Sequence, residues 1–197
     1  MDADDLDPDP FVQFAEWYDG VLAAGLPEPS AVVLSTAGAD GRPVGRHVLL
    51  RGHGPDGFVF FTNYESRKGH QLAENPYASL TFPWYPIHRQ AIVTGPVERV
   101  SPAESDAYFA SRTRESQLGA WASEQSSEIP DRAWLDDRFA ELDARYAGGP
   151  VPRPPHWGGY RLRPDAIELW QQGPNRLHDR FRYTLEGEHW RLARLSP

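Results

Sequence analysis

Residues 166–180, near the C-terminus, read Ala-Ile-Glu-Leu-Trp-Gln-Gln-Gly-Pro-Asn-Arg-Leu-His-Asp-Arg, and the rest of the chain can be organised around them. The run from Ala166 to Trp170 is apolar and strand-like, and a Gly-Pro-Asn turn follows it. If the backbone beyond the turn is extended, Arg176, His178 and Arg180 leave it on one face. Two guanidiniums and an imidazole on one face can hold an anion such as a phosphate. An exposed basic strand that pairs with nearby acids such as Glu168 would explain the same pattern.

The length and composition of the chain limit its architecture. With 197 residues, of which 40% are hydrophobic, the sequence predicts one globular domain over residues 10–197. Residues 1–9 are acidic and contain prolines, so we expect a mobile arm there. No apolar run approaches the roughly 18 residues of a membrane helix, and no membrane partner is expected.

Charge and cysteine content exclude several classes of function. The net charge of −8 argues against general nucleic-acid binding, which needs a basic surface. The chain has no cysteine, which excludes disulfides, thiolate metal sites and a cysteine nucleophile. The N-terminus is acidic where a secretory signal would be basic, so a cytoplasmic location is the default expectation.

Short strand-like segments with turn signals make up most of the chain. They span residues 31–36, 44–51, 58–62, 78–84, 89–100, 157–162, 166–170, 180–185 and 189–195. Gly95-Pro96 predicts a bulge or an edge break in one of them. Helical patterns begin near residues 10, 66, 101 and 130. About nine short strands with a few interposed helices predict a mainly β fold, a β-barrel with peripheral helices.

The one lysine of the chain, Lys68, stands at the start of a predicted helix. Every other basic residue is an arginine, so this lysine marks a position that favours a compact ammonium group. Ser66 is a suitable N-cap, which puts Arg67 and Lys68 in the first turn, where the helix dipole disfavours positive charge. A bound anion would remove this conflict, so we predict that the helix start binds a phosphate.

Further positive side chains stand on separate predicted elements. They are Arg46, Arg51, Arg112, Arg176 and Arg180. This number exceeds what one phosphate needs and indicates two phosphorylated ligands, one of them a cofactor that carries the chemistry. Residues 116–126 are rich in small and hydrogen-bonding side chains and suit the wall of a polar ligand site. Metal-ligand spacings, Gly-x-Ser-x-Gly, Walker and Rossmann glycine motifs are absent.

From about Asp5 to Pro197 the chain resembles the pyridoxamine (pyridoxine) 5'-phosphate oxidases. The motifs that carry the resemblance stand in family order: Arg46-His47-Val48-Leu49-Leu50-Arg51, Phe60-Phe61-Thr62-Asn63, Ser66-Arg67-Lys68, Arg89-Gln90, the block from Tyr108-Phe109 to Gln125-Ser126, Trp157-Gly158-Gly159-Tyr160 and Arg176-Leu177-His178-Asp179-Arg180. The resemblance implies a mainly β (α+β) split β-barrel that forms a homodimer, with FMN at the subunit interface.

The resemblance also implies roles for individual residues. Contacts with FMN would come from Arg46, His47, Val48, Leu49, Leu50, Arg51, Phe61, Thr62, Arg67, Lys68, Gln90, Gln125, Ser126, Trp170 and Arg180, with the FMN phosphate on Arg67 and Lys68. The substrate would be held by Arg51, Tyr108, Arg112, Ser116, Arg176, Leu177 and His178. Among these, Arg176 and His178 would be catalytic and lie over the substrate ring. Trp157, Trp121 and Tyr160 are interpreted as packing residues.

The implied activity is that of an FMN-dependent oxidoreductase, a pyridoxal 5'-phosphate synthase of vitamin B6 metabolism. Its substrates are small phosphorylated pyridines, pyridoxine 5'-phosphate or pyridoxamine 5'-phosphate. A hydride would leave the C4' carbon for flavin N5, and O2 would reoxidise the flavin to give hydrogen peroxide, with ammonia released from the amine. Two features depart from the family: Arg51 stands where lysine is usual, and the N-terminal arm is short and acidic.

Two alternatives remain at this point. A related FMN oxidase of secondary metabolism, such as the phenazine-pathway branch, would keep the flavin site and change the substrate pocket. A non-catalytic flavin-binding or heme-binding split barrel would not need a second anion site. Tyr108, Arg112, Ser116, Arg176 and His178 are all present, which favours the phosphorylated substrate.

Overall fold

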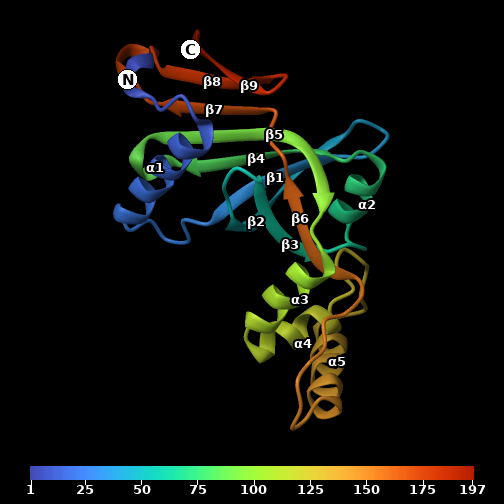
Figure 1. The fold of residues 1–197 in the computed structure, drawn as a ribbon. Helices are drawn as coiled ribbons and strands as arrows, with labels where there is room; N and C mark the ends of the chain where they lie inside the picture. Colours follow the sequence, from blue (N-terminus) through green and yellow to red (C-terminus); the bar gives the residue numbers. More distant parts are fainter.

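Nine strands and five α-helices form the fold of residues 1–197, all of which are described by the computed structural model (Figure 1). The strands are β1 Ala31–Ala37, β2 Pro43–Gly52, β3 Phe58–Asn63, β4 Tyr77–Trp84, β5 Arg89–Arg99, β6 Trp157–Leu162, β7 Ala166–Gln171, β8 Asp179–Glu186 and β9 His189–Leu195. The helices are α1 Pro10–Ala23, α2 Arg67–Glu74, α3 Pro102–Ser111, α4 Arg114–Ala122 and α5 Arg132–Arg145, with short 3₁₀ turns η1 Ala3–Asp5, η2 Tyr85–Ile87 and η3 Pro174–Arg176. The predicted mainly β fold with peripheral helices is confirmed.

The sheet closes into a barrel and then continues beyond it. Its strands follow the order β4-β1-β2-β3-β6-β5-β7-β8-β9, and β4 also pairs with β5, which closes six antiparallel strands. Strand β5 pairs with β7 as far as Thr94 and with β6 from Val97 onward. The predicted irregularity at Gly95-Pro96 is therefore a change of neighbour within a continuous strand. A Cβ at Gly95 would lie 2.0 Å from the carbonyl oxygen of Arg163, so only glycine lets the β6–β7 connection cross here.

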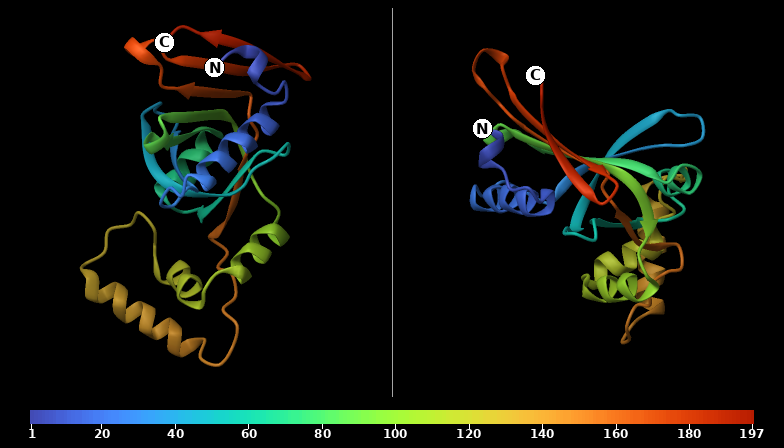
Figure 2. Two further views of the ribbon diagram at one scale, coloured as in Figure 1. Left: turned by 90° about the vertical axis from the view of Figure 1, so that its left-hand side faces the viewer. Right: turned by 45° about the horizontal axis from the view of Figure 1, so that its top comes forward.

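Two hydrophobic clusters hold the fold together. In the barrel, Phe14 of α1 is fully buried and meets Phe58 and Phe82 edge to face, with ring centroids 4.8 and 5.0 Å apart. A smaller cluster joins Phe109 of α3, Leu118 of α4 and Leu142 of α5 to Trp157 at the start of β6. Figure 2 shows that α3–α5 lie at one end of the barrel and β7–β9 at the other.

Helix α2 begins where the sequence predicts. The Ser66 side chain accepts a hydrogen bond from the backbone N–H of Gly69, which caps the helix. Gly69 is also the point at which the helix passes closest to the preceding loop, since a Cβ there would lie 1.9 Å from the carbonyl oxygen of Tyr64. The position of Lys68 therefore depends on the small size of its neighbour.

Replacing Gly69 with alanine should destabilise the protein although alanine favours helices. The methyl group would push α2 away from Tyr64, and we expect a loss of about 2 kcal/mol, measured as a lower midpoint in urea. Gly119→Ala in α4 is the matched control, because no atom lies within 4 Å of its added Cβ. That control should be neutral or stabilising by up to ~1 kcal/mol. Equal urea midpoints for the Gly69→Ala and Gly119→Ala variants would contradict this account of α2.

The N-terminal residues lie against the last hairpin. Turn η1 contacts β9, Leu6 is buried, and the guanidinium of Arg194 binds the carboxylate of Asp2 at 2.8 Å. The mobility expected for residues 1–9 stays a prediction. No helix of the structure combines the length and the apolar character that crossing a membrane requires.

Candidate active site

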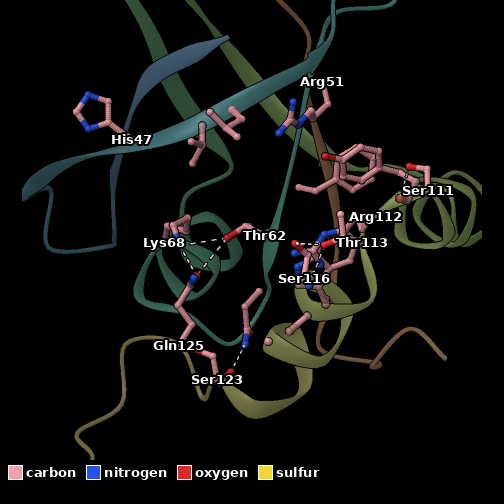
Figure 3. Close-up of a pocket in the computed structure, with 18 residues that line it drawn as sticks. His47, Arg51, Thr62, Lys68, Ser111, Arg112, Thr113, Ser116, Ser123 and Gln125 are labelled. Carbon is pink, nitrogen blue, oxygen red and sulfur yellow. Dashed lines mark hydrogen bonds between the residues drawn. The ribbon is translucent and has the colours of Figure 1, made fainter. Parts of the chain in front are cut away.

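A cavity of about 700 Å³ lies between the barrel and the helices α2, α3 and α4 (Figure 3). Many of the residues singled out from the sequence line it: His47, Val48, Leu49, Arg51, Phe61, Thr62, Lys68, Tyr108, Arg112, Ser116 and Gln125. They come from β2, β3, α2, the α3–α4 junction and the segment after α4. The fold thus brings together residues that are up to 110 positions apart in the chain, from His47 to Trp157.

One end of the cavity is built around Lys68, in the first turn of α2. The residue is only 8% exposed, and its ammonium group donates hydrogen bonds to Thr62 Oγ1 at 3.1 Å, Ser66 Oγ at 3.1 Å and Gln125 Oε1 at 2.6 Å. All three acceptors are neutral, and no carboxylate lies within 4 Å. Burial, together with the nearby charge of Arg46, lowers the pKa of Lys68 to about 8. A buried ammonium without a negative partner at a helix N-terminus is a site for an anion.

The other end of the cavity is formed by the junction of α3 and α4. Thr113 caps α4: its side chain accepts from the backbone N–H of Ser116, and its hydroxyl bonds the Ser116 hydroxyl at 3.1 Å. Beside this helix start, Arg112 has a buried Nη1 with no hydrogen-bond partner. Burial lowers the pKa of Arg112, Tyr108 opposes this shift, and Arg51 adds to it. A desolvated guanidinium at a helix N-terminus makes a second place for an anion.

Aromatic rings line the wall between the two ends. Phe61 and Tyr108 are stacked with centroids 4.0 Å apart, and the Arg51 guanidinium lies 5.9 Å from the centre of the Tyr108 ring. Trp157, for which the sequence predicts a packing role, also lines the cavity. The wall suits flat, partly apolar ligands whose negative groups lie at the two ends of the cavity.

Four predicted contact residues lie close to this cavity without lining it. Arg46 donates to Leu34 O, Thr36 Oγ1 and Gln71 Oε1, so its guanidinium ties β2 to β1 and α2. The Leu50 side chain is buried in the barrel core because alternate residues of a strand point to opposite faces. The backbone N–H of Arg67 bonds Ser126 Oγ at 3.2 Å. Their contacts with a ligand stay predictions.

A second group of predicted residues lies in the C-terminal part of the sheet. Gln90, Trp170 and Arg180 are directly opposite one another across β5, β7 and β8. The turn before β8 carries Arg176, Leu177 and His178. None of these side chains lines the cavity that contains Lys68 in the same chain. The predicted site residues therefore fall into two separate groups.

The prediction that Arg176, His178 and Arg180 share one face of an extended run is wrong. Residues 174–176 form the 3₁₀ turn η3, in which Asn175 and Arg176 have φ angles of 55° and 63°, and β8 begins only at Asp179. Asparagine tolerates this left-handed conformation, and the preceding proline favours a turn. The Nδ1 atom of His178 accepts from the backbone N–H of Gly173 at 3.3 Å.

Arg180 behaves as the alternative interpretation of the sequence suggested. Its Nη2 lies 2.8 Å from a carboxylate oxygen of Glu168, and its Nη1 donates to the Ser196 carbonyl at 2.9 Å. Arg176, by contrast, forms no ion pair with any acid, and Leu177 next to it is 69% exposed. This turn presents an unpaired charge and an apolar side chain at the surface.

Gly119, Ala120 and Ser123 also line the cavity, as expected for the segment 116–126 that the sequence predicts as a ligand-site wall. The cavity residues that the sequence did not indicate as ligand contacts are Asn63, Ser111, Thr113 and Trp157. The helix break near Thr113 is the signal that could have indicated Ser111 and Thr113. The structure brings together no group of three or more histidine and acidic side chains that could hold a metal ion.

Two family models and named relatives match most of the chain. A family described as "Pyridoxamine 5'-phosphate oxidase" matches residues 19–146, and one described as "Pyridoxine 5'-phosphate oxidase C-terminal dimerisation region" matches residues 157–197. Proteins named pyridoxine/pyridoxamine 5'-phosphate oxidase are similar to the chain. That of Salinispora arenicola is 58% identical, covering 95% of this chain and 86% of its own length. That of Paraburkholderia phymatum is 57% identical, covering 100% and 93%.

Solved structures share the fold. PhzG from Burkholderia lata, crystallised in complex with tetrahydrophenazine-1-carboxylic acid, aligns with a TM-score of 0.93 at 34% identity and covers 98% of this chain and 95% of its own. A pyridoxamine 5'-phosphate oxidase-related, FMN-binding protein from Nostoc punctiforme aligns with a TM-score of 0.75 at 17% identity, covering 96% and 98%. The second likeness concerns the fold alone.

Proposed function

The chain belongs to the pyridoxamine 5'-phosphate oxidase family, and from this premise we propose that it is an FMN-dependent oxidase that makes pyridoxal 5'-phosphate. The substrates are pyridoxine 5'-phosphate and pyridoxamine 5'-phosphate. With the alcohol, O2 is consumed and hydrogen peroxide is formed; with the amine, water is also consumed and ammonia is released. The observation that carries the proposal is one cavity with an anion site at each end.

The end around Lys68 fits the phosphate of FMN. A buried ammonium with three neutral acceptors needs a negative group to balance its charge, and the start of α2 adds backbone N–H groups. Gln125 and Thr62 hold the ammonium in place from two sides. When bound, FMN supplies the acceptor for a hydride and passes the electrons to O2.

The end around Arg112 fits the phosphate of the substrate. Arg112, the Ser116 hydroxyl and the start of α4 together provide charge and donors for a dianion, with Tyr108 and Arg51 beside them. Because the ends of the cavity are separate, the substrate phosphate and the cofactor phosphate do not compete. A substrate without a phosphate would not need this set of charged and hydrogen-bonding groups around Arg112.

The C-terminal group completes the site in a homodimer. The region that contains Trp170, Arg176, His178 and Arg180 matches the family's dimerisation region, and its turn exposes Leu177 and an unpaired Arg176. We assign these residues to the cavity of the partner subunit, where Arg176 and His178 orient the substrate ring and exchange a proton with it.

The phenazine branch is the second candidate, favoured by the likeness to PhzG. That protein is 34% identical, whereas the relatives named pyridoxine/pyridoxamine 5'-phosphate oxidase reach 57–58%. The second anion site also favours the phosphorylated substrate. A non-catalytic flavin-binding or heme-binding barrel has no use for that site.

An aerobic assay tests the proposal. The purified protein should be yellow, and it should consume oxygen and form pyridoxal 5'-phosphate with either phosphorylated vitamer. Unphosphorylated pyridoxine is the control and should react far more slowly at equal concentration. A yellow protein that leaves both phosphorylated vitamers unchanged would refute the substrate assignment, and a protein without affinity for FMN would refute the cofactor.

The pKa of Lys68 predicts how FMN binding depends on pH. A bound phosphate favours the ammonium form and raises its pKa, so affinity is nearly constant around pH 7 and falls as the pH rises through about 8 and the free protein loses the proton. We expect the dissociation constant to rise about tenfold from pH 7 to pH 9, measured by quenching of FMN fluorescence. Lys68→Arg should show a flat profile, since a guanidinium stays charged. A flat profile in the wild type would contradict the assignment.

A further inference from the structure

Most arginines around the helical end of the barrel are held by carboxylates. Arg161 binds Glu104 at 3.0 Å, Arg114 binds Asp143 at 3.0 Å, and Arg153 binds Asp106. In each case the acid both fixes the guanidinium and neutralises it. Such an arginine is poorly suited to capture another anion, because the ligand would have to displace the acid.

Arg112 is held in a different way. No carboxylate lies within 4 Å of it, and its Nη1 is buried without a hydrogen-bond partner. Its guanidinium carbon lies 4.6 Å from the centre of the Trp157 ring and 5.7 Å from that of Phe109. The side chain therefore lies against aromatic faces while its donors remain unused.

The Trp157 ring is itself held firmly. Trp157 is 7% exposed, begins β6 and lies opposite Asn63 of β3, and its carbonyl accepts from Arg153 Nη1 at 2.6 Å. Its ring meets Phe109 edge to face at 5.2 Å and lies nearly parallel to Phe61 at 5.6 Å. The barrel and α3 together determine where the indole face is presented.

We propose that Trp157 is a positioning residue for Arg112: the indole keeps the guanidinium in place by a cation–π contact and leaves its charge and donors available to the substrate phosphate. An aromatic face attracts a cation through its quadrupole but accepts no conventional hydrogen bond from the N–H groups. Trp157 thus does what a carboxylate does for Arg161, without supplying a competing anion. This inference deepens the proposed function and rests on it.

The test compares phosphorylated and unphosphorylated ligands on the FMN-loaded protein. We expect Trp157→Phe to raise the dissociation constant of pyridoxal 5'-phosphate about threefold to tenfold, and Trp157→Leu to raise it about 30-fold. The KM for pyridoxine 5'-phosphate should rise in parallel while kcat changes less than about twofold. Binding of pyridoxal, which lacks the phosphate, should be unchanged. Trp121→Phe is the matched control, because Trp121 packs beside the same cluster without lining the cavity or touching Arg112.

A double-mutant cycle separates positioning from general packing. In an Arg112→Ala background, Trp157→Phe should have no further effect on pyridoxal 5'-phosphate binding. The inference would be overturned if Trp157→Phe lowered the affinity for pyridoxal 5'-phosphate equally in both backgrounds. It would also be overturned if the affinities for pyridoxal and for its phosphate fell equally. If Trp157→Leu does not fold, the cycle with phenylalanine still decides. Wild-type protein that binds no pyridoxal 5'-phosphate would refute the proposed function, whereas tight binding that is unaffected by Trp157→Phe would refute this inference alone.

Discussion

Lys68→Met should weaken FMN binding about 100-fold or more and at the same time leave the FMN-free protein as stable as the wild type, or more stable. The loss of affinity follows from removing one partner of a buried charge pair, which costs about 2–5 kcal/mol. The stability effect has the opposite sign because, without a ligand, the buried ammonium is desolvated and has only neutral partners. Methionine keeps the length of the side chain without the charge.

Titration with FMN and urea unfolding of the FMN-free protein measure the two effects separately. Arg42→Met is the matched control: it also removes one positive charge, but Arg42 is 86% exposed and does not line the cavity. Its FMN affinity should be within about twofold of the wild type. A Lys68→Met protein with normal FMN affinity would place the cofactor phosphate elsewhere, and a strongly destabilised one would make Lys68 a structural residue.

Arg176→Ala should lower turnover of pyridoxine 5'-phosphate about 100-fold to 1,000-fold while FMN stays bound. Loss of one charged donor from a reacting centre has effects of this size. Arg176 has no ion-pair partner in its own chain, and its left-handed φ of 63° is accessible to alanine at similar cost, so the fold should be unaffected. Arg182→Ala, an exposed arginine within β8, should have nearly normal turnover.

Mixed dimers test whether Arg176 acts in the partner's cavity. If Arg176→Ala and Lys68→Met chains are unfolded together and refolded as a mixture, half of the dimers contain one chain of each kind. In such a dimer the Arg176→Ala chain has an intact Lys68 cavity, which receives Arg176 from its partner, so about a quarter of wild-type activity should return. No recovery would indicate that Arg176 acts within its own chain. Release of FMN from Arg176→Ala, with normal turnover once FMN is resupplied, would contradict its catalytic role.

The sequence predicted local features well because local physics determines them. Ser66 caps α2 as expected, since its hydroxyl needs only a backbone N–H three residues ahead. The apolar spacing of Phe14 and Trp17 correctly placed the buried face of α1. The conflict between Lys68 and the helix dipole predicts an anion site at this helix start without knowledge of any neighbour.

Other features depend on residues that are distant in the chain. A tryptophan after a proline-rich connector predicts only a packing role. Its contact with the Arg112 guanidinium depends on a residue 45 positions earlier and leaves no pattern in the local sequence. The extended run expected from Arg176 to Arg180 is interrupted by η3, where the turn brings Gly173 against Leu177 so closely that a Cβ would lie 2.1 Å from its carbonyl oxygen. The alternation of basic residues from Arg176 to Arg180 did not predict this reversal of the chain.

The sequence by itself determined the nine strands, the helices α1, α2, α3 and α5 and the kinds of charged group available to ligands, because hydrophobic period, capping and turn chemistry act over a few residues. It did not predict helix α4, because the small and polar residues of this segment favoured a ligand-site wall over a helix. Only the tertiary structure decided which groups meet. Closure of the barrel brings Lys68, Gln125 and Arg112 to one cavity, and it leaves Arg176 and His178 in a separate part of the chain. The physical reason is that burial and pairing between distant segments set these distances, and neither leaves a local pattern in the sequence.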